Sequence, residues 1–287
     1  MSLFLELNNL MVKYRFRPEK KLGQHFIVNE GVIEKMVSAA NLGPKDRVLE
    51  IGAGTGFLTR RLLEKSSVLA FEKDERLCEL LLKELEQERL ELHCSDYLAE
   101  KGLEYNKTVS FPPYFLSKKI VLKVLEEKPE LCVMVFQREF ADKLLALPGF
   151  EEYSALSALA QYHYRIEDLG TIQAKRFFPK PKSDSGIIAM HRIERKEKSS
   201  NDEGFAHFVD EVFRHKNKNL SNALQDSKGF LSARANIKAV EVEKFKDTKA
   251  KRKVFCMEVE ELVSLYNSLA TPTKKTKKKK KQKKQPS

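Results

Sequence analysis

Short apolar runs alternate with amphipathic stretches between residues 48 and 193. The runs have the length of buried strands, and the stretches between them place apolar residues on one helical face. Strands that alternate with helices are typical of a mostly parallel sheet that is covered on both faces. Strands are predicted at Val48–Ile51, Val68–Phe71, Leu90–Cys94, Thr108–Ser110, Cys132–Phe136 and Gly186–Ile193. The pattern therefore predicts an α/β fold with a doubly wound sheet.

Helical periodicity replaces the strand runs after about residue 199. Five apolar residues fall at positions i, i+3, i+4, i+7 and i+8 of one amphipathic helix: Phe205, Phe208, Val209, Val212 and Phe213. Residues 194–204 are polar and rich in turn residues, which indicates a domain boundary. We therefore expect an N-terminal extension (1–19), an α/β domain (20–196), a helical C-terminal domain (197–270) and a tail (271–287).

The charge of the chain is concentrated at one end. The 287 residues include 53 Lys+Arg and 41 Asp+Glu, which gives a formal net charge of +12. Residues 271–287 hold nine lysines and no acid, so they carry three quarters of this excess. We expect this segment to be disordered, because it buries nothing and repels itself. It is either a solubilising end or a tether for a polyanion, of which nucleic acid is the expected one.

Several other classes of protein are excluded by the sequence. No apolar run approaches the roughly 18–20 residues of a membrane helix, and Glu6 interrupts the N-terminal apolar stretch, unlike in a signal peptide. The four cysteines form no CxxC pair, so neither a metal site nor a disulfide framework is predicted. Cys94 and Cys132 are expected to be buried thiols. We expect a cytoplasmic protein that does not contact membranes.

A glycine-rich turn, with Gly52, Gly54 and Gly56, follows the first predicted strand. It lacks the Lys-Ser/Thr of a phosphate-binding loop and the glycine spacing of a dinucleotide site. The next strand ends at Glu72, where a carboxylate can accept both ribose hydroxyls of a nucleoside. The third strand ends near Asp96, which can accept from an adenine amine or cap the following segment. These three strand ends resemble those of the class I S-adenosylmethionine-dependent methyltransferases.

The fourth predicted strand leads into a rigid loop, Pro112-Pro113, and then Tyr114, which can stack on a flipped base. Here the resemblance becomes specific. From Lys20 to about Leu224 the chain is similar to the small-subunit ribosomal RNA adenine dimethyltransferases of the KsgA type. The matching motifs are KLGQHF (21–26), the loop at 50–59, QREFA (137–141), YSALS (153–157), FFPKPKSDS (177–185) and FRHKNK (213–218).

The resemblance implies a seven-stranded methyltransferase sheet followed by a small helical domain. It also implies S-adenosylmethionine as cofactor and two methyl transfers to the exocyclic amine of adenosine, at two adjacent adenosines near the 3′ end of small-subunit RNA. Tyr114 would stack on the target adenine, and the partner would be the pre-ribosomal small subunit, bound by a monomer. By position, the resemblance gives eight cofactor-binding residues: Gln24, His25, Gly52, Gly54, Gly56, Glu72, Asp96 and Ser110.

One position departs from the family, because Phe111 stands where the family has Asn. In the family, the Asn oxygen and the next residue's backbone carbonyl accept the two hydrogen bonds of the attacking amine. Phe111 accepts nothing, so only the carbonyl of Pro112 remains. Losing one such bond costs about 2–4 kcal/mol, or about 10²- to 10³-fold in rate. The chain is therefore an engineered variant, a natural assembly factor that does not methylate, or a slow enzyme.

Two functions are favoured, a ribosomal RNA adenine dimethyltransferase and a non-catalytic RNA-binding assembly factor. A third, that of a relative recruited to transcription, lacks support, because the chain has no Arg/Ser-rich, acid-free N-terminus. Both favoured functions need contacts to RNA outside the tail, and a stripe of cations near the family motifs would supply them. For each single cation, a solvated surface charge is the alternative. The stripe is predicted from Lys175, Arg176, Lys180, Lys182, Arg214, Lys216 and Lys218.

We expect a chain that lacks residues 271–287 to bind ribosomal RNA more weakly and with a smaller salt dependence than the full chain. The reason is that each lysine–phosphate contact releases counterions. The choice of adenosines is expected to stay unchanged, since the folded body sets it. Titrations of labelled ribosomal RNA at about 50 and 200 mM salt measure the difference. Equal salt slopes for the two chains would contradict a role of the tail as a tether.

Overall fold

The computed structural model describes residues 2–85, 88–243 and 252–270. The chain forms two compact units, Met1–Leu145 with Tyr164–Arg192, and Ala146–His163 with Ile193–Ser287. The sequence places one boundary near residue 196, whereas residues 146–163 group with the second unit in the structure. The predicted tail lies outside the described residues. None of the helices in these ranges is long and apolar enough to cross a membrane.

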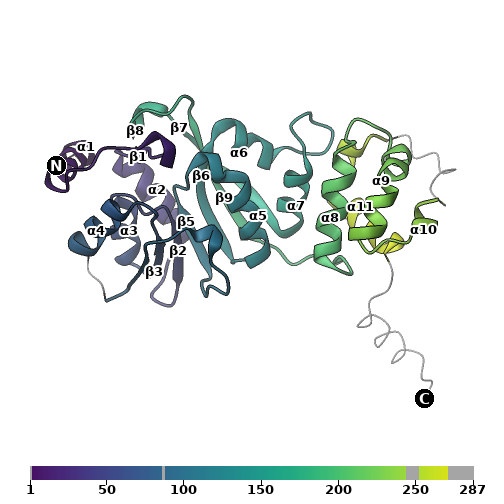
Figure 1. The fold of residues 1–287 in the computed structure, drawn as a ribbon, viewed down its shortest axis with the longest axis horizontal. Helices are drawn as coiled ribbons and strands as arrows, with labels where there is room; N and C mark the ends of the chain where they lie inside the picture. The colour runs from purple at the N-terminus through teal and green to yellow at the C-terminus, as the bar shows by residue number, and fades with distance from the viewer. Residues whose placement is uncertain (1, 86–87, 244–251, 271–287) are drawn as a thin grey trace, which may run out of the picture. The chain divides into compact units, whose positions relative to one another are not determined.

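A seven-stranded sheet forms the centre of the first unit (Figure 1). Its order is β4-β3-β2-β5-β6-β9-β7, in which the neighbours from β4 to β6 pair in parallel and β9 pairs antiparallel with both β6 and β7. The chain enters at β2 and winds outward on both sides, so the predicted doubly wound, seven-stranded sheet is confirmed. The strands are β2 (Arg47–Ile51), β3 (Ser67–Phe71), β4 (Leu90–His93), β5 (Lys107–Ser110), β6 (Leu131–Gln137), β7 (Tyr164–Ile172) and β9 (Ser185–Arg192).

The sequence predicts six of these strands and misses β7. This strand lies at the edge of the sheet, and only its first and last residues, Tyr164 and Ile172, are buried. Its other side chains are exposed or half-buried, so it has no apolar run of the kind that marks the central strands. Periodicity therefore could not identify β7, although it identified β4 at the other edge of the sheet.

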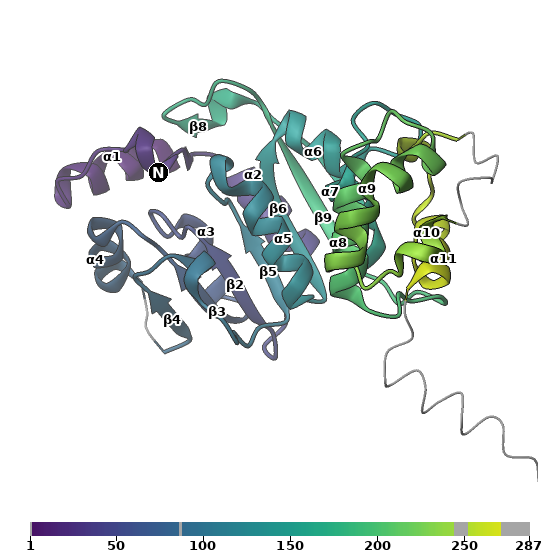
Figure 2. The ribbon, with the colours of Figure 1, turned by 45° about the vertical axis from the view of Figure 1, so that its right-hand side comes forward.

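Helices cover both faces of the sheet. The apolar residues of α2, α3 and α4 form one buried cluster with every second residue of the strands, for example Val48 and Val68. The intervening residues, such as Leu49 and Leu69, are equally buried and point to the opposite face, where α5 lies (Figure 2). The helices are α2 (Glu30–Ala40), α3 (Phe57–Leu63), α4 (Glu75–Glu84), α5 (Ser117–Glu127) and α6 (Arg138–Leu145).

A small second sheet joins two distant motifs of the first unit. Strand β1 (Phe26–Ile27) pairs antiparallel with β8 (Phe177–Phe178), and the N–H of Val28 donates to the carbonyl of Arg176 at 2.9 Å. This pairing ties the entry motif to the proline-rich segment, about 150 residues further along the chain. The predicted N-terminal extension is also part of this unit, because helix α1 (Leu3–Lys13) buries one apolar face in the same cluster.

The second unit is helical in its described residues, as predicted for 197–270. The five apolar residues of the predicted amphipathic helix are all buried in α8. Phe205 and Phe208 pack against Tyr266, with ring centroids 5.7 and 5.6 Å away. The apolar stripe therefore makes the core of this unit. Its helices are α7 (Ala155–His163), α8 (Asp202–Phe213), α9 (Leu220–Arg234), α10 (Ala239–Glu243) and α11 (Val259–Leu269).

The cysteines depart from the prediction. Cys132 is buried, as expected, but Cys94 is exposed and forms a disulfide with Cys78 of α4. The two Cα atoms are 5.9 Å apart, although the residues are 16 positions apart in the sequence. The prediction of no disulfide was therefore wrong, because the fold brings the end of β4 beside α4, and spacing in the sequence does not show this.

We expect reduction of the Cys78–Cys94 disulfide to lower the free energy of unfolding by about 3 kcal/mol, the value typical of a closed loop of this length. Urea unfolding with and without a thiol reductant measures the change. A double variant, Cys78→Ser with Cys94→Ser, is the control and should not respond to the reductant. The prediction would be contradicted if the unsubstituted chain had the same unfolding midpoint with and without the reductant.

Candidate active site

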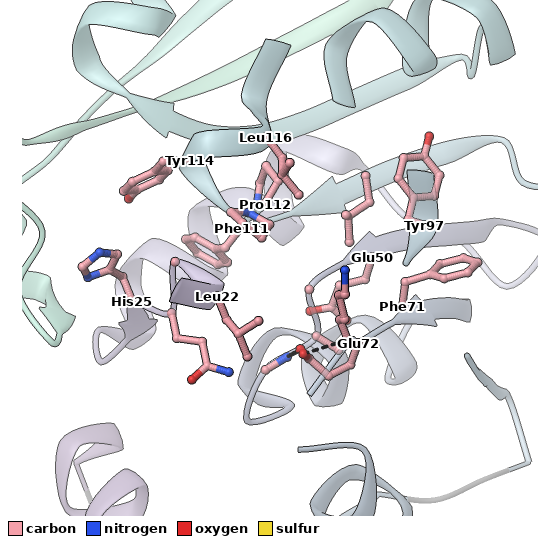
Figure 3. Close-up of a pocket in the computed structure, with 18 of the residues that line it drawn as sticks. Leu22, His25, Glu50, Phe71, Glu72, Tyr97, Phe111, Pro112, Tyr114 and Leu116 are labelled. Atoms are coloured by element: carbon pink, nitrogen blue, oxygen red, sulfur yellow. Dashed lines mark hydrogen bonds between the residues drawn. The ribbon is translucent and has the colours of Figure 1, made fainter. Parts of the chain in front are cut away.

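A cavity of about 310 Å³ opens where four parallel strands of the first unit end. Its wall is built from the segments that follow β2, β3, β4 and β5, with residues 21–27 and Phe177 (Figure 3). Parallel strands bring their carboxyl ends to one edge of a sheet, so residues far apart in sequence meet there. Six of the eight predicted cofactor residues line the cavity: Gln24, His25, Gly52, Gly54, Glu72 and Asp96.

The other two predicted residues, Gly56 and Ser110, do not belong to the cavity wall. Gly56 precedes α3 with a φ of +78°, and a Cβ atom there would lie 2.9 Å from Leu81, so only glycine allows this close packing. Ser110 is fully buried, and its hydroxyl accepts from the N–H of Ile51 at 3.1 Å and donates to the carbonyl of Ile51 at 2.7 Å. Both residues hold the frame of the site together instead of facing a ligand.

Glu72 follows β3 and is 8% exposed. One of its carboxylate oxygens accepts from the N–H of Gly54 at 2.8 Å. The other accepts from the N–H groups of Lys73 and Asp74 at 2.8 and 2.9 Å. Burial raises the pKa of Glu72, and these N–H groups oppose the rise. The carboxylate therefore joins the glycine turn after β2 to the end of β3.

Glu50 is a second buried acid in the wall, and the sequence analysis missed it. It lies in β2, one residue before the strand ends, beside Glu72 in Figure 3. Its Oε2 atom is buried and has no hydrogen-bond partner among the described residues. Burial raises the pKa of Glu50 to about 8; the Thr59 hydroxyl opposes this rise, and the charge of Glu72 adds to it. A buried polar atom without a partner is unfavourable, so this position favours a ligand that donates a hydrogen bond.

Asp96 follows β4 and caps a short 3₁₀ turn, Tyr97–Ala99. Its Oδ1 accepts from the N–H of Leu98 at 2.9 Å, and its Oδ2 accepts from the ammonium group of Lys73 at 3.3 Å. Although partial burial opposes ionisation, these two bonds hold the pKa of Asp96 below its usual value. The capping role that the sequence allows is therefore present, and the residue also lines the cavity.

Gln24 lines the cavity, but neighbouring residues hold its side-chain amide. The Nε2 atom donates to Asp74 at 2.8 Å, and Oε1 accepts from the N–H of Glu19 at 2.8 Å. Arg76 pairs with both of these acids, at 2.6 and 2.7 Å. Gln24 therefore acts as a positioning residue that fixes residues 21–27 against the start of α4.

His25 and Tyr114 lie at the other end of the cavity from the two acids (Figure 3). Their rings are stacked, with centroids 5.9 Å apart and planes 19° apart. The His25 Nδ1–H donates to the carbonyl of Pro179 at 2.6 Å, and the Tyr114 hydroxyl is hydrogen-bonded to the Ser185 hydroxyl at 2.7 Å. Burial raises the pKa of Tyr114 to about 12, so the phenol is neutral. Two hydrogen bonds thus fix an aromatic surface at this end.

Phe111 lies between the two ends of the cavity (Figure 3). Its ring meets Phe177 edge to face, with centroids 6.2 Å apart and an interplanar angle of 80°. The side chain has no hydrogen-bond acceptor, and the neighbouring Ser110 hydroxyl does not replace one, because it is engaged with Ile51. The structure thus places an apolar ring in the wall where the family pattern has an amide.

The cations predicted to contact RNA are divided between the two units. Four of them, Lys175, Arg176, Lys180 and Lys182, belong to the first unit. The other three belong to the second unit and have partners within it: Arg214 with Glu211, Lys216 with the carbonyl of Glu151, and Lys218 with Asp226. The stripe that would combine all seven stays a prediction.

Besides Glu50, the sequence analysis missed the apolar part of the wall. The side chains there carry no chemical signal of a site, even where they lie inside a family motif, as Leu22 and Phe177 do. They include Leu22, Leu98, Phe115, Leu116 and Phe177. In the part of the chain that the structure describes, no group of three or more His, Cys, Asp or Glu residues is arranged to hold a metal ion.

The fold and the cavity together define a class of protein. The sheet is doubly wound and has one antiparallel strand near its edge. A glycine turn follows β2, and a buried acid follows β3. This is the arrangement of the Rossmann-like methyltransferases. A model of the ribosomal RNA adenine dimethylases matches residues 15–263. The chain belongs to this family, whose members use S-adenosylmethionine as methyl donor.

Named relatives support the same assignment. The chain is 37% identical over 226 residues to a probable ribosomal RNA small subunit methyltransferase A of Thermococcus sibiricus. The aligned residues make up 78% of this chain and 82% of the relative. A protein of the same name from Thermococcus gammatolerans is 33% identical over 265 residues, which is 90% of this chain and 92% of that one. The resemblance stated from the motifs is therefore confirmed.

Solved structures share the fold. A dimethyladenosine transferase from Plasmodium falciparum superimposes with a TM-score of 0.69 over 84% of this chain and 96% of that one, at 23% identity. The 23S rRNA methyltransferase ErmE superimposes with a TM-score of 0.61 over 85% and 99% of the two chains, at 25% identity. The predicted fold class is thus confirmed.

The buried carboxyl of Glu50 gives the protein a pH-dependent stability. Its pKa rises from 4.5 to about 8 on folding, so between these values the folded state keeps a proton that the unfolded chain has lost. The free energy of unfolding therefore falls as the pH rises through this window. We expect Glu50→Gln to remove this contribution, which is at most about 5 kcal/mol because one pKa unit corresponds to about 1.4 kcal/mol.

Urea unfolding of the parent chain and of Glu50→Gln at about pH 5 and pH 8 measures the effect. Glu126→Gln, which changes an exposed acid of α5, is the matched control and should keep the pH dependence of the parent. If Glu50→Gln lost as much stability between the two pH values as the parent does, the assignment of this proton to Glu50 would be wrong.

Proposed function

We propose that the chain binds S-adenosylmethionine and small-subunit ribosomal RNA in the manner of a ribosomal RNA adenine dimethyltransferase, but that Phe111 makes its methyl transfer slow. The observation that carries the proposal is the contrast within one cavity. At the end with the acids, Glu72 has all three of its backbone hydrogen bonds, whereas the middle of the wall has an apolar ring in place of an acceptor.

The residues at the acidic end fit the cofactor. Glu72 would hold the ribose of the cofactor, and the unpartnered Oε2 of Glu50 would accept a hydrogen bond from the cofactor's ammonium group. Gly52 and Gly54 leave the space that side chains would otherwise fill, and their φ values of +77° and +59° suit glycine. Asp96, which also lines the cavity, would accept from the adenine amine. The bound cofactor supplies a methyl group on a positive sulfur, which an uncharged amine can attack directly.

The residues at the aromatic end would receive the target adenine. Tyr114 presents a neutral ring that His25 and Ser185 hold in place, which suits stacking on a flipped base. The backbone carbonyl of Pro112 would accept one hydrogen bond from the amine. The second acceptor is absent, because Phe111 has none and the Ser110 hydroxyl is occupied. Since the reaction needs no strong base, catalysis depends on how the two acceptors position the amine, and the loss of one of them lowers the rate.

Contacts to RNA outside the cavity complete the proposal. Lys180 and Lys182 lie in the segment that connects β8 to β9, close in sequence to the cavity residue Phe177. Together with Lys175 and Arg176 they would contact phosphates, and Arg214, Lys216 and Lys218 would do so from the second unit. We propose that the chain acts as a monomer in the cytoplasm, on the assembling small subunit.

Phe111 also favours a second function, that of a non-catalytic assembly factor. The edge-to-face contact of Phe111 with Phe177 gives the apolar ring a packing role of its own. A chain that binds the cofactor and the RNA but transfers no methyl group would keep the whole frame described here. Only the rate of transfer separates the two functions.

We expect Phe111→Asn to raise the rate of methyl transfer by about 10²- to 10³-fold, because it restores the missing acceptor. Incorporation of labelled methyl groups into immature small subunits measures this rate. Phe111→Leu is the matched control, since it changes the size of the side chain without adding an acceptor and should stay slow.

Binding of S-adenosylmethionine, followed by calorimetry, should be similar in the parent and both variants. Measurable transfer by the parent that Phe111→Asn accelerates supports a slow enzyme. No transfer by the parent, with activity gained only by Phe111→Asn, supports the assembly factor. No gain for Phe111→Asn over the parent chain, at unchanged cofactor binding, would show that position 111 does not limit the reaction.

A further inference from the structure

Phe115 is a large aromatic residue that lies exposed at the rim of the cavity. It follows Tyr114 directly, belongs to the residues that line the cavity, and is 64% exposed. Tyr114, in contrast, is hydrogen-bonded to Ser185 inside the cavity. Two consecutive aromatic rings therefore lie at different depths of one site. The function proposed above uses only the inner ring.

The ring of Phe115 has a defined position although it faces solvent. A Cβ atom built on Gly23 would lie 2.9 Å from Phe115 Cε1 and 3.0 Å from Cδ1, so the ring edge lies directly against the Gly23 backbone. Gly23 has a φ of +67°, which lets the chain turn away beneath the ring. One edge of Phe115 is thus packed on the entry motif, while much of the ring is accessible. A ring held in this way loses little conformational entropy when a ligand covers it.

Three exposed lysines belong to the cavity wall or to the segment that follows Phe115. Lys21 lines the cavity, and its side chain is 79% exposed although it pairs with Glu19 at 3.0 Å. Lys118 and Lys119 are exposed in the first turn of α5, three and four residues after Phe115. An exposed aromatic ring among lysines suits a single-stranded nucleic acid, in which bases stack and phosphates need cations. A protein partner would favour a contiguous apolar patch instead.

We propose that Phe115 is the stacking platform for the nucleobase next to the target adenosine. The inference rests on the function proposed above, in which Tyr114 holds the target base. A base flipped into the cavity takes its neighbour to the rim, because one nucleotide step joins them. Tyr114 and Phe115 then hold two successive bases, one inside and one outside. The second base is recognised by its flat surface, so any base is accepted at this position.

The test is a binding cycle with the full-length chain and a fluorescent RNA hairpin whose loop contains two adjacent adenosines. Matched hairpins carry an abasic site at one or the other of these positions. Phe115→Ala is expected to weaken binding by about 5- to 150-fold, the range for loss of one base–aromatic stack. Removal of the neighbouring base should weaken binding of the parent chain by the same factor, and it should not weaken Phe115→Ala further.

Two variants separate stacking from structure. Phe115→Trp should keep the affinity of the parent, whereas Phe115→Leu, which still covers Gly23 but has no aromatic face, should behave like Phe115→Ala. Phe150→Ala removes a ring that is similarly exposed, at 61%, and should leave RNA binding unchanged. Affinity for S-adenosylmethionine should stay within about twofold in Phe115→Leu, since the entry loop remains covered.

Tyr114→Ala distinguishes this inference from the proposed function. One outcome is that Tyr114→Ala binds the intact hairpin no better than the one that lacks the target base, while Phe115→Ala still binds more weakly when the neighbouring base is removed. In that case the stacking role of Phe115 is wrong and the proposed function stands. If the parent chain loses no affinity for RNA when either abasic site is introduced, both are wrong. If Phe115→Ala weakens binding to whole small subunits but not to the hairpin, Phe115 contacts a ribosomal protein, and the inference fails.

Discussion

The buried carboxylate of Glu72 in the cavity wall connects two loops that backbone hydrogen bonds from Gly52 and Ala53 to the carbonyl of Phe71 also join. Its oxygens accept the N–H groups of Gly54, Lys73 and Asp74, so the glycine turn after β2 and the segment after β3 share one acceptor. Because this carboxylate is buried, these N–H groups would have no comparable partner without it. The Glu72 carboxylate and these backbone bonds together hold this end of the cavity in shape.

The two ends of the cavity are held in place by different kinds of interaction, so residues at one end can be replaced while those at the other keep their positions. The acidic end is fixed by hydrogen bonds at strand ends, and it continues through Asp74 and Gln24 to the entry motif. The aromatic end is fixed by ring contacts and by the bonds of His25 and Tyr114. Phe111 lies between the two ends and packs on Phe177, and the hydrogen bonds named for the two ends do not involve its side chain.

Much of the fold is visible in the sequence, because the central strands are buried on both faces and therefore appear as short apolar runs. The edge strand β7 is not visible, since most of its side chains are exposed or half-buried. The strand ends also identify residues that line the cavity, as glycines and acids stand at fixed places after β2, β3 and β4. Glu50 was missed because an acid inside a strand looks like an ordinary interruption of an apolar run, and nothing local shows that its carboxyl is buried.

By itself, the sequence determined the alternation of strands and helices, the chemistry at the strand ends and the family motifs, all of which depend on residues close together in the chain. Only the tertiary structure decided which distant residues meet. It paired β1 with β8, joined Cys78 to Cys94 and packed Phe115 on Gly23. It also engaged the Ser110 hydroxyl with Ile51, which leaves Phe111 without a substitute acceptor. The physical reason is that a hydrogen bond or a ring contact depends on distance and direction in space, and local spacing along the chain fixes neither.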